Sequence, residues 1–233
     1  MSHPFTSSPL VRDVETILDV METRQPAVAA HCRRVAAYGV QFAAHLGLPG
    51  DLVDTIRVGG LLHDVGKMAV SPAILAKPGR LTEQEWKALQ SHPEYGFDMA
   101  ERLGFDAAIL DIILYHHERN DSSGYPDGLA GRSIPFTVRI ISVMDAFDAL
   151  TSPRTYRAAL SIDAARALLA REAYCPWVVC GLRSIPRPVL EAVARNEAAG
   201  CPTDCGPNPR VVESATTRWT PTYREEAGII TDW

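Results

Sequence analysis

The chain has 233 residues, of which 46% are hydrophobic, so it is long enough for one large or two small domains with a substantial core. Its formal net charge of −5 argues against a nucleic-acid polymer as partner and against a polybasic membrane anchor. It has no apolar run of about 18 residues and no signal-peptide pattern at its start, so we expect a cytoplasmic protein with no membrane span.

Apolar residues at helical spacing predict helices along most of the chain, and no strand alternation persists. Thr82 with Glu85 three residues later is a capping box, and Ser71 before Pro72 is a second helix start. The polar, glycine-rich stretch 118–133 is predicted to be a loop. The expected fold is a single all-α bundle with helices over about 10–21, 26–46, 51–64, after 71, 82–103 with a kink at Pro93, 107–117, 135–150 and after 161.

His63 and Asp64 stand side by side where the apolar pair Leu61-Leu62 leads into Gly66 and Lys67. Burying a histidine and an aspartate beside a core is costly unless something binds them, and a divalent metal ion is the simplest partner. Taken singly, each such residue is more simply a hydrogen-bonded core residue or a helix cap, but several together indicate one site. Further residues of this kind on apolar helices are His31, His92, His116, His117 and Asp145. Mixed imidazole and carboxylate ligands favour iron, manganese or zinc over calcium.

Three ordered motifs carry a family resemblance: His63-Asp64 with Gly66-Lys67, then His116-His117-Glu118-Arg119, then Gly124-Tyr125-Pro126. They resemble the HD-GYP family, a branch of the HD-domain metal-dependent phosphohydrolases. The resemblance covers about residues 10–172 and includes Arg33-Arg34-Val35, His92-Pro93-Glu94-Tyr95-Gly96, the stretch from Asp145 to Ser152, and Arg154-Thr155-Tyr156-Arg157.

The resemblance implies an HD-domain helical bundle with a cleft that holds two divalent transition-metal ions, iron or manganese first and zinc as an alternative. It implies that one ion is held by His31, His63, Asp64 and Asp145, and the other by Asp64, His92, His116 and His117. Asp64 would then bridge the ions, and a hydroxide between them would attack the phosphorus. Some family members bind a third ion through a glutamate one turn before the first histidine; Ala27 occupies that position here, which favours two ions.

By the same resemblance, Asp64 and Lys67 are the catalytic residues, with Lys67 steadying the scissile phosphate. Lys67 has a simpler interpretation as a cation at a helix end. The expected substrate-binding residues are Gly124, Tyr125, Arg154 and Arg157, although the two arginines also fit a solvated pair at a helix end. Glu118 and Arg119 are expected to pair with each other or to fix the loop.

The resemblance implies a phosphodiesterase that hydrolyses cyclic di-GMP to pGpG and, as an open alternative, onward to GMP. Two other hypotheses stay open: an HD phosphohydrolase acting on another nucleotide, and a catalytically silent protein that binds cyclic di-GMP. The expected small-molecule partner is cyclic di-GMP, with a regulatory protein partner or a homodimer left open.

The sequence divides into a lead-in with its helix at 1–26, a catalytic domain at 27–200, and a divergent, poorly patterned tail at 201–233. Beyond about residue 172 the pattern loosens. The short helix that family members carry after a phenylalanine-aspartate-proline turn is expected at 184–193, which makes 173–183 an insertion. The five cysteines, an odd number, argue against a disulfide framework.

Overall fold

A computed structural model describes residues 9–153 and 158–195 of the chain. Within these residues the fold is all-α, as predicted, and the isolated pairing of Asp121 with Ala130 is its one β-bridge. None of the described helices is long and apolar enough to cross a membrane. The elements are α1 (Pro9–Arg24), α2 (Pro26–His45), α3 (Gly50–Leu62), η2 (Val65–Ala69), α4 (Pro72–Leu75), α5 (Glu83–Gln90), α6 (His92–Arg102), α7 (Ala107–Tyr115), η3 (Gly131–Ser133), α8 (Phe136–Thr151), α9 (Ile162–Leu169), α10 (Pro176–Ser184) and α11 (Arg187–Ala194).

Local signals set several of the helix starts. Thr82 and Glu85 form the predicted capping box, in which each side chain accepts a hydrogen bond from the other residue's backbone N–H. Ser161 caps α9 through Ala164 N. Ser71 makes no such capping bond, and α4 behind it has only four residues. The single kinked helix predicted at 82–103 is two helices, because the chain turns at Ser91 before α6 begins.

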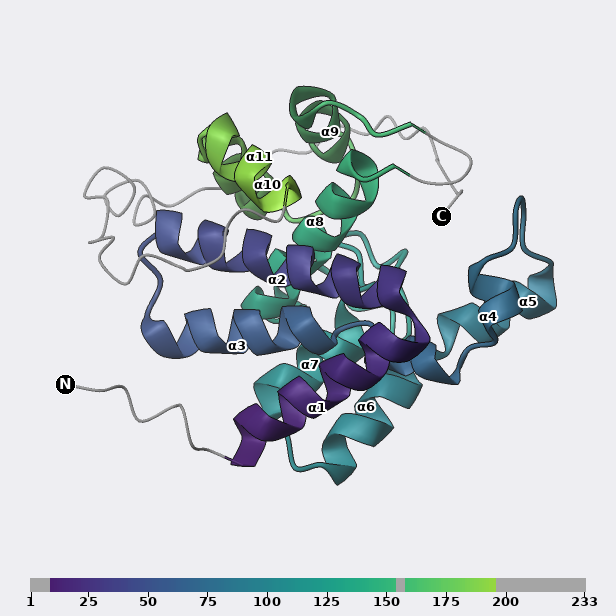
Figure 1. The fold of residues 1–233 in the computed structure, drawn as a ribbon. Coiled ribbons are helices and arrows are strands. Elements are labelled where there is room, and N and C mark those ends of the chain that lie inside the picture. Colours follow the sequence, from purple (N-terminus) through teal and green to yellow (C-terminus); the bar gives the residue numbers. More distant parts are fainter. Residues whose placement is uncertain (1–8, 154–157, 196–233) are drawn as a thin grey trace.

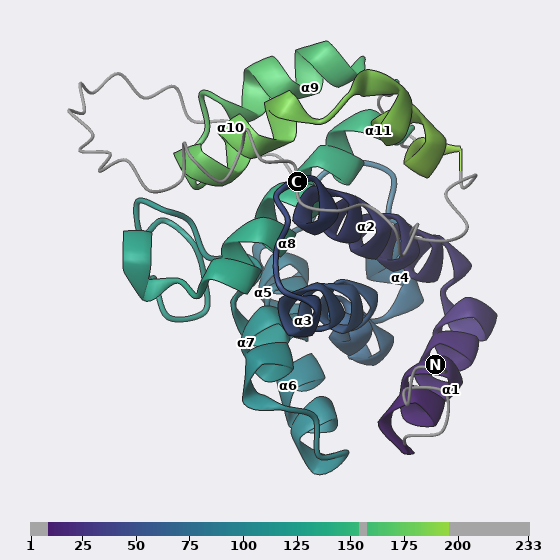
Figure 2. The same ribbon diagram turned by 90° about the vertical axis from the view of Figure 1, so that its left-hand side faces the viewer.

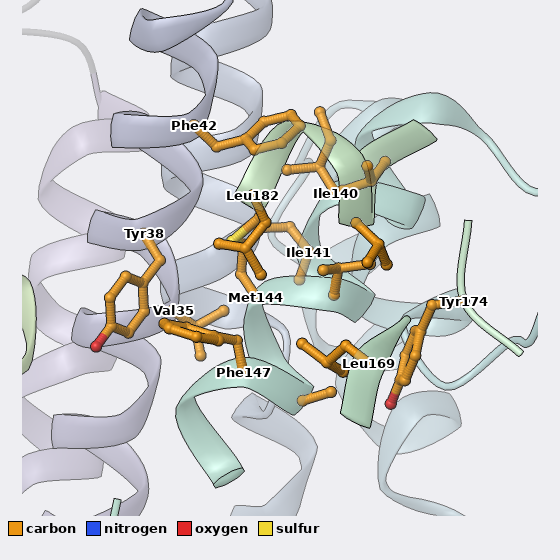
Figure 3. Close-up of a cluster of buried hydrophobic side chains, with 14 of the residues drawn as sticks. Val35, Tyr38, Phe42, Ile140, Ile141, Met144, Phe147, Leu169, Tyr174 and Leu182 are labelled. Carbon is orange, nitrogen blue, oxygen red and sulfur yellow. The ribbon is translucent and has the colours of Figure 1, made fainter. Parts of the chain in front are cut away.

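The helices pack in layers around α8 (Figure 1). Helices α2 and α3 lie side by side, and α9, α10 and α11 cover the face of α2 and α8 that lies away from α3 (Figures 1 and 2). The larger core cluster joins α2 and α8 to this cover, with Tyr38 against Phe147 at 5.1 Å between ring centroids (Figure 3). A second cluster joins α1 to α3, α6 and α7, and Met21, Cys32 and Leu62 are fully buried in it.

Helix α10 occupies most of the segment 173–183, which the sequence predicted to be an insertion. Its residues Val178, Val179 and Leu182 are buried in the larger core cluster. A nine-residue helix that buries three apolar side chains contributes to the core, so this segment is part of the bundle. Helix α11 lies at 187–194, where the sequence predicted a short helix.

The backbones of η2 and α6 touch at Gly66. A Cβ atom built on Gly66 would lie 1.8 Å from His92 O and 2.5 Å from Gly96 N, both of them backbone atoms. No side chain fits there, so glycine permits this close approach of two backbone segments. The contact places the residues after Asp64 directly against the start of the helix that carries His92.

We expect Gly66→Ala to destabilise the protein by about 1–3 kcal/mol or more, because the added methyl group overlaps backbone and not a movable side chain. Gly50→Ala is the matched control, since nothing lies within 4 Å of a Cβ there and alanine favours the first turn of α3. Urea denaturation of both variants measures the difference. Equal stability of Gly66→Ala and the parent would contradict the close approach.

Candidate metal centre

Asp64 lies at the middle of a buried cluster of histidines, just after the end of α3, and its side chain is 1% exposed. Its two oxygens face different partners. Oδ1 lies 3.2 Å from His92 Nε2 and 3.7 Å from His116 Nε2. Oδ2 lies 3.5 Å from His63 Nε2 and 3.7 Å from His31 Nε2. One carboxylate thus connects two groups of imidazoles, which is the arrangement expected of a ligand that bridges two ions.

Three histidines of the cluster directly follow, or follow by two residues, the last residue of a helix, and each is oriented by that preceding helix. The Nδ1 atoms of His63, His92 and His116 lie 2.8, 2.7 and 2.9 Å from the carbonyl oxygens of Gly60, Leu89 and Ile113, each three residues earlier. Carbonyls in the last turn of a helix lack an intrahelical donor, so they are available to the rings. Because a carbonyl can only accept, Nδ1 carries a hydrogen, and in the neutral ring Nε2 has a lone pair that points into the cluster.

These lone pairs converge on one another and on Asp64. His92 Nε2 lies 3.2 Å from His116 Nε2, and both face Oδ1 of Asp64. Asp64 Oδ1 and His63 Nε2 are buried without a hydrogen-bond partner. Several acceptors cannot face one another at such distances without a proton or a cation between them.

The donor atoms fall into two groups in which all members lie within 4.8 Å of one another: Asp64, His92, His116 and His117, and His31, His63 and Asp64. The described residues therefore fit a centre for two metal ions that share Asp64. Imidazole and carboxylate donors with no thiolate suit first-row transition metals.

His31 is held differently, by carboxylates on α8. Its Nε2 lies 3.0 Å from Asp145 Oδ1, and its Nδ1 lies 2.7 Å from Asp148 Oδ2. Arg34 clamps Asp148 from the other side, with Nε 2.7 Å from Oδ1 and Nη2 2.9 Å from Oδ2. Asp148 thus fixes the ring of His31 so that Nε2 faces Asp64 and Asp145.

In this cluster, burial and the neighbouring charges shift the pKa values of the side chains in opposite directions. Burial acts to lower the pKa of His31, but the hydrogen bonds that its ring donates to Asp145 and Asp148 raise it to about 9. Burial likewise acts against the charged form of His63, whereas the charge of Asp64 raises its pKa to about 9. His116 lacks such compensation, and burial together with the charge of His63 lowers its pKa to about 3. Against burial, the charges of Lys67 and His63 hold the pKa of Asp64 well below its usual range.

A family profile described as "HD domain" matches residues 15–177, which is more than half of the chain. The chain belongs to the HD-domain family. The match includes the Tyr174-Cys175-Pro176 turn at the start of α10, so the prediction that 173–183 is an insertion is wrong for residues 173–177.

Curated relatives of this HD domain are cyclic-dinucleotide phosphodiesterases by name. The chain is 41% identical over 151 residues to the cyclic di-GMP phosphodiesterase response regulator RpfG of Xanthomonas campestris, covering 64% of this chain and 40% of the relative. It is 40% identical over 150 residues to the 3′3′-cGAMP-specific phosphodiesterase 3 of Vibrio cholerae, covering 64% of this chain and 33% of the relative. The chain thus spans well under half of either relative. These matches confirm the predicted HD-GYP resemblance.

Solved structures share the fold of this HD domain. Bd1817, an HDGYP protein from Bdellovibrio bacteriovorus, superimposes with a TM-score of 0.58 at 22% identity, over 68% of this chain and 52% of that one. The PgpH HD domain of L. monocytogenes in complex with cyclic-di-AMP superimposes with a TM-score of 0.54 at 19% identity, over 80% of this chain and 98% of that one.

In this HD domain the loop after α7 is tied to the metal centre by Glu118. The buried carboxylate of Glu118 accepts hydrogen bonds from Asp127 N at 2.8 Å and Gly128 N at 2.9 Å. A Cβ on Gly124 would lie 2.4 Å from Glu118 Cα, so glycine lets the loop fold back on its own start. The ring of Tyr125 then stacks on His117, with centroids 4.8 Å apart and planes inclined by 27°.

The structure brings together all seven predicted metal-ligand residues, and Lys67 with them, because its Nζ lies 2.6 Å from Asp64 Oδ2. Gly124 and Tyr125 border the same cluster, whereas Arg154 and Arg157 lie outside the described residues. Ala27 is exposed and offers no ligand, as predicted. Glu118 fixes the loop and makes no ion pair with Arg119.

Sequence reasoning missed the role of Asp148 and Arg34. Both residues stand inside motifs that carried the resemblance, but nothing in the sequence links two positions 114 residues apart. A usable signal was the spacing of Asp145 and Asp148, which puts two carboxylates on one face of a helix opposite His31.

We expect Asp148→Asn to weaken metal binding about 10- to 100-fold, because the amide keeps the shape but loses the charge that holds His31 and Arg34. Manganese titration by calorimetry, with a chelator as competitor, measures the affinity. Asp54→Asn is the control, since Asp54 pairs with Arg57 on the exposed face of α3. Unchanged affinity in Asp148→Asn would show that His31 is oriented without this carboxylate.

Proposed function

We propose that this HD domain is a metal-dependent phosphodiesterase that hydrolyses cyclic di-GMP to pGpG. The observation that carries the proposal is the convergence of imidazole nitrogens on the two oxygens of Asp64, because two cations in adjacent positions would satisfy both groups of donor atoms. Relatives named as cyclic di-GMP phosphodiesterases, at 41% and 39% identity, support the substrate.

His31, His63, Asp64 and Asp145 are proposed to hold one ion, and Asp64, His92, His116 and His117 the other. Iron or manganese suits these donors best, and zinc is the alternative. Two such ions supply an activated water as the nucleophile and neutralise charge on the phosphoryl oxygens.

The chain's own residues orient the reaction. Asp64 holds both groups of ligands in register, and Asp148 fixes the ring of His31. Lys67 is proposed to turn from Asp64 toward a non-bridging oxygen of the scissile phosphate once the carboxylate is neutralised by the ions. Tyr125, which is half-buried and stacked on His117, forms a wall against which a nucleobase or ribose can rest. Arg154 and Arg157 are proposed as phosphate contacts by resemblance alone.

A second candidate substrate is 3′3′-cGAMP. Three of the relatives are named as 3′3′-cGAMP-specific phosphodiesterases, and two of them are 40% identical to this chain. The two dinucleotides differ in one base, so the metal centre itself does not distinguish them. The groups that contact the bases must decide the preference.

We expect the purified protein to bind close to two transition-metal ions per chain, and Asp64→Ala to lose both, because one carboxylate serves both groups of ligands. Metal content by inductively coupled plasma mass spectrometry measures this. Asp98→Ala on the exposed face of α6 is the control. Retention of one full equivalent in Asp64→Ala would contradict the bridging role.

We expect the manganese- or iron-reconstituted protein to convert cyclic di-GMP to pGpG, with slower conversion to GMP. Chromatography of parallel reactions with cyclic di-GMP and 3′3′-cGAMP measures both products and preference. Faster turnover of 3′3′-cGAMP would assign the second substrate. Binding of either dinucleotide without turnover by fully metallated protein would support the catalytically silent alternative.

A further inference from the structure

Arg119 lies beside the metal centre with its guanidinium stacked on Tyr174. The Arg119 Cζ atom is 4.1 Å from the centroid of the Tyr174 ring. The two segments are also joined by backbone, since Asn120 N donates to Ala173 O at 2.8 Å. Tyr174 is only 7% exposed, so its ring is a fixed support for the arginine. A stacked guanidinium keeps its in-plane N–H groups available for another partner.

Geometry places Arg119 near the metal centre, because it follows His117 by two residues and a Cβ on Gly124 would lie 2.5 Å from both Arg119 N and His117 O. Tyr125, the residue after Gly124, stacks on His117. Burial is the main cause of the raised pKa of Tyr174, and the charges of Arg119 and Asp145 both act on its phenol. Burial also raises the pKa of Tyr125, whose phenol is influenced by Asp64, Asp145 and Arg119. Arg119 therefore shares one neighbourhood with the ring that stacks on His117 and with the carboxylates of the cluster.

Arg119 differs from the other cations around the centre because no described carboxylate forms an ion pair with it. Lys67 is engaged by Asp64, and Arg34 is engaged by Asp148. The acid nearest in sequence, Asp121, already accepts hydrogen bonds from Ser123 N and Oγ. Arg119 Nη1 is buried and has no hydrogen-bond partner. A buried guanidinium N–H without an acceptor indicates a missing anionic ligand.

We propose that Arg119, supported by Tyr174, binds the phosphate of the cyclic dinucleotide that is not being hydrolysed. This inference rests on the proposed function. A cyclic dinucleotide carries two phosphodiester groups in one ring, and only one of them can sit on the metal ions at a time. The second needs its own cationic partner, because a phosphate that leaves water is stabilised only where a charged or hydrogen-bonding group replaces the water. A planar guanidinium can contact two phosphate oxygens at once.

The test compares a substrate that has a second phosphate with one that lacks it. Arg119→Gln is expected to lower kcat/KM for cyclic di-GMP about 10- to 100-fold, mainly through a higher KM, because a charge-assisted contact is lost. The same variant is expected to hydrolyse bis(4-nitrophenyl) phosphate, which has a single phosphodiester, at close to the parent rate and with unchanged metal content. Arg57→Gln, on the exposed face of α3, is the control.

Variants of Tyr174, whose ring supports Arg119, distinguish a loss of substrate binding from a loss of folding. Tyr174→Phe keeps the ring under Arg119 and is expected to behave like the parent. Tyr174→Leu removes the ring and is expected to shift KM for cyclic di-GMP in the same direction as Arg119→Gln. Thermal melts identify any variant that has lost its fold, and Arg119→Lys, which keeps the charge without the planar fork, is expected to fall between Arg119→Gln and the parent.

Equal losses on both substrates in Arg119→Gln would overturn the inference, because they would mean that Arg119 only holds the loop in place. Parent-like activity on cyclic di-GMP would overturn it as well. Failure of the proposed function looks different, since the parent protein itself would then hydrolyse bis(4-nitrophenyl) phosphate but neither cyclic di-GMP nor 3′3′-cGAMP.

Discussion

The buried carboxylate of Asp64 is the interaction on which the rest of the centre depends. An ionised carboxylate that is 1% exposed has a desolvation cost of several kcal/mol, which the neighbouring groups must offset. In the protein alone, Lys67 and the histidines supply positive charge around it. That compensation is incomplete, because Oδ1 has no hydrogen-bond donor and faces imidazole lone pairs. Two divalent cations would satisfy both oxygens at once, which explains why a fold retains so polar a group next to its core.

Helix ends position three of the clustered histidines. His63 and His116 follow the last residues of α3 and α7, and His92 follows α5 by two residues. Each ring uses a carbonyl of the preceding turn, so the element that delivers the ligand also sets its orientation. His31 lies in the middle of α2, where carbonyls are already bonded within the helix, and it depends on Asp148 instead. The loop after α7 is connected directly to the cluster, because Glu118, which holds the loop, is the next residue after His117.

The sequence was sufficient for the helical class, for most helix starts and for the residues that gather in the buried His–Asp cluster, because these rest on short-range patterns and on motifs with fixed spacing. The break at Ser91 was misplaced because Pro93 suggested a kink, whereas proline in the first turn of α6 is compatible with a new helix. Helix α10 was not predicted, although its buried residues Val178, Val179 and Leu182 stand at helical spacing. Contacts such as Asp148 to Arg34 and Arg119 to Tyr174 join distant segments, so only the tertiary structure could reveal them.

The spacing of the residues around Asp64 has a thermodynamic consequence. His31, His63, His92, His116 and Asp145 follow one another at intervals of roughly 30 residues, and they come from different helices. Ions bound by them would close a series of chain loops, much as covalent cross-links do, and each closure removes conformational freedom from the unfolded chain. Because the unfolded chain offers no such preassembled cage, the free energy of metal binding becomes free energy of folding. Metal ions bound at this centre would thereby stabilise the whole bundle against unfolding, in addition to any part that they take in catalysis.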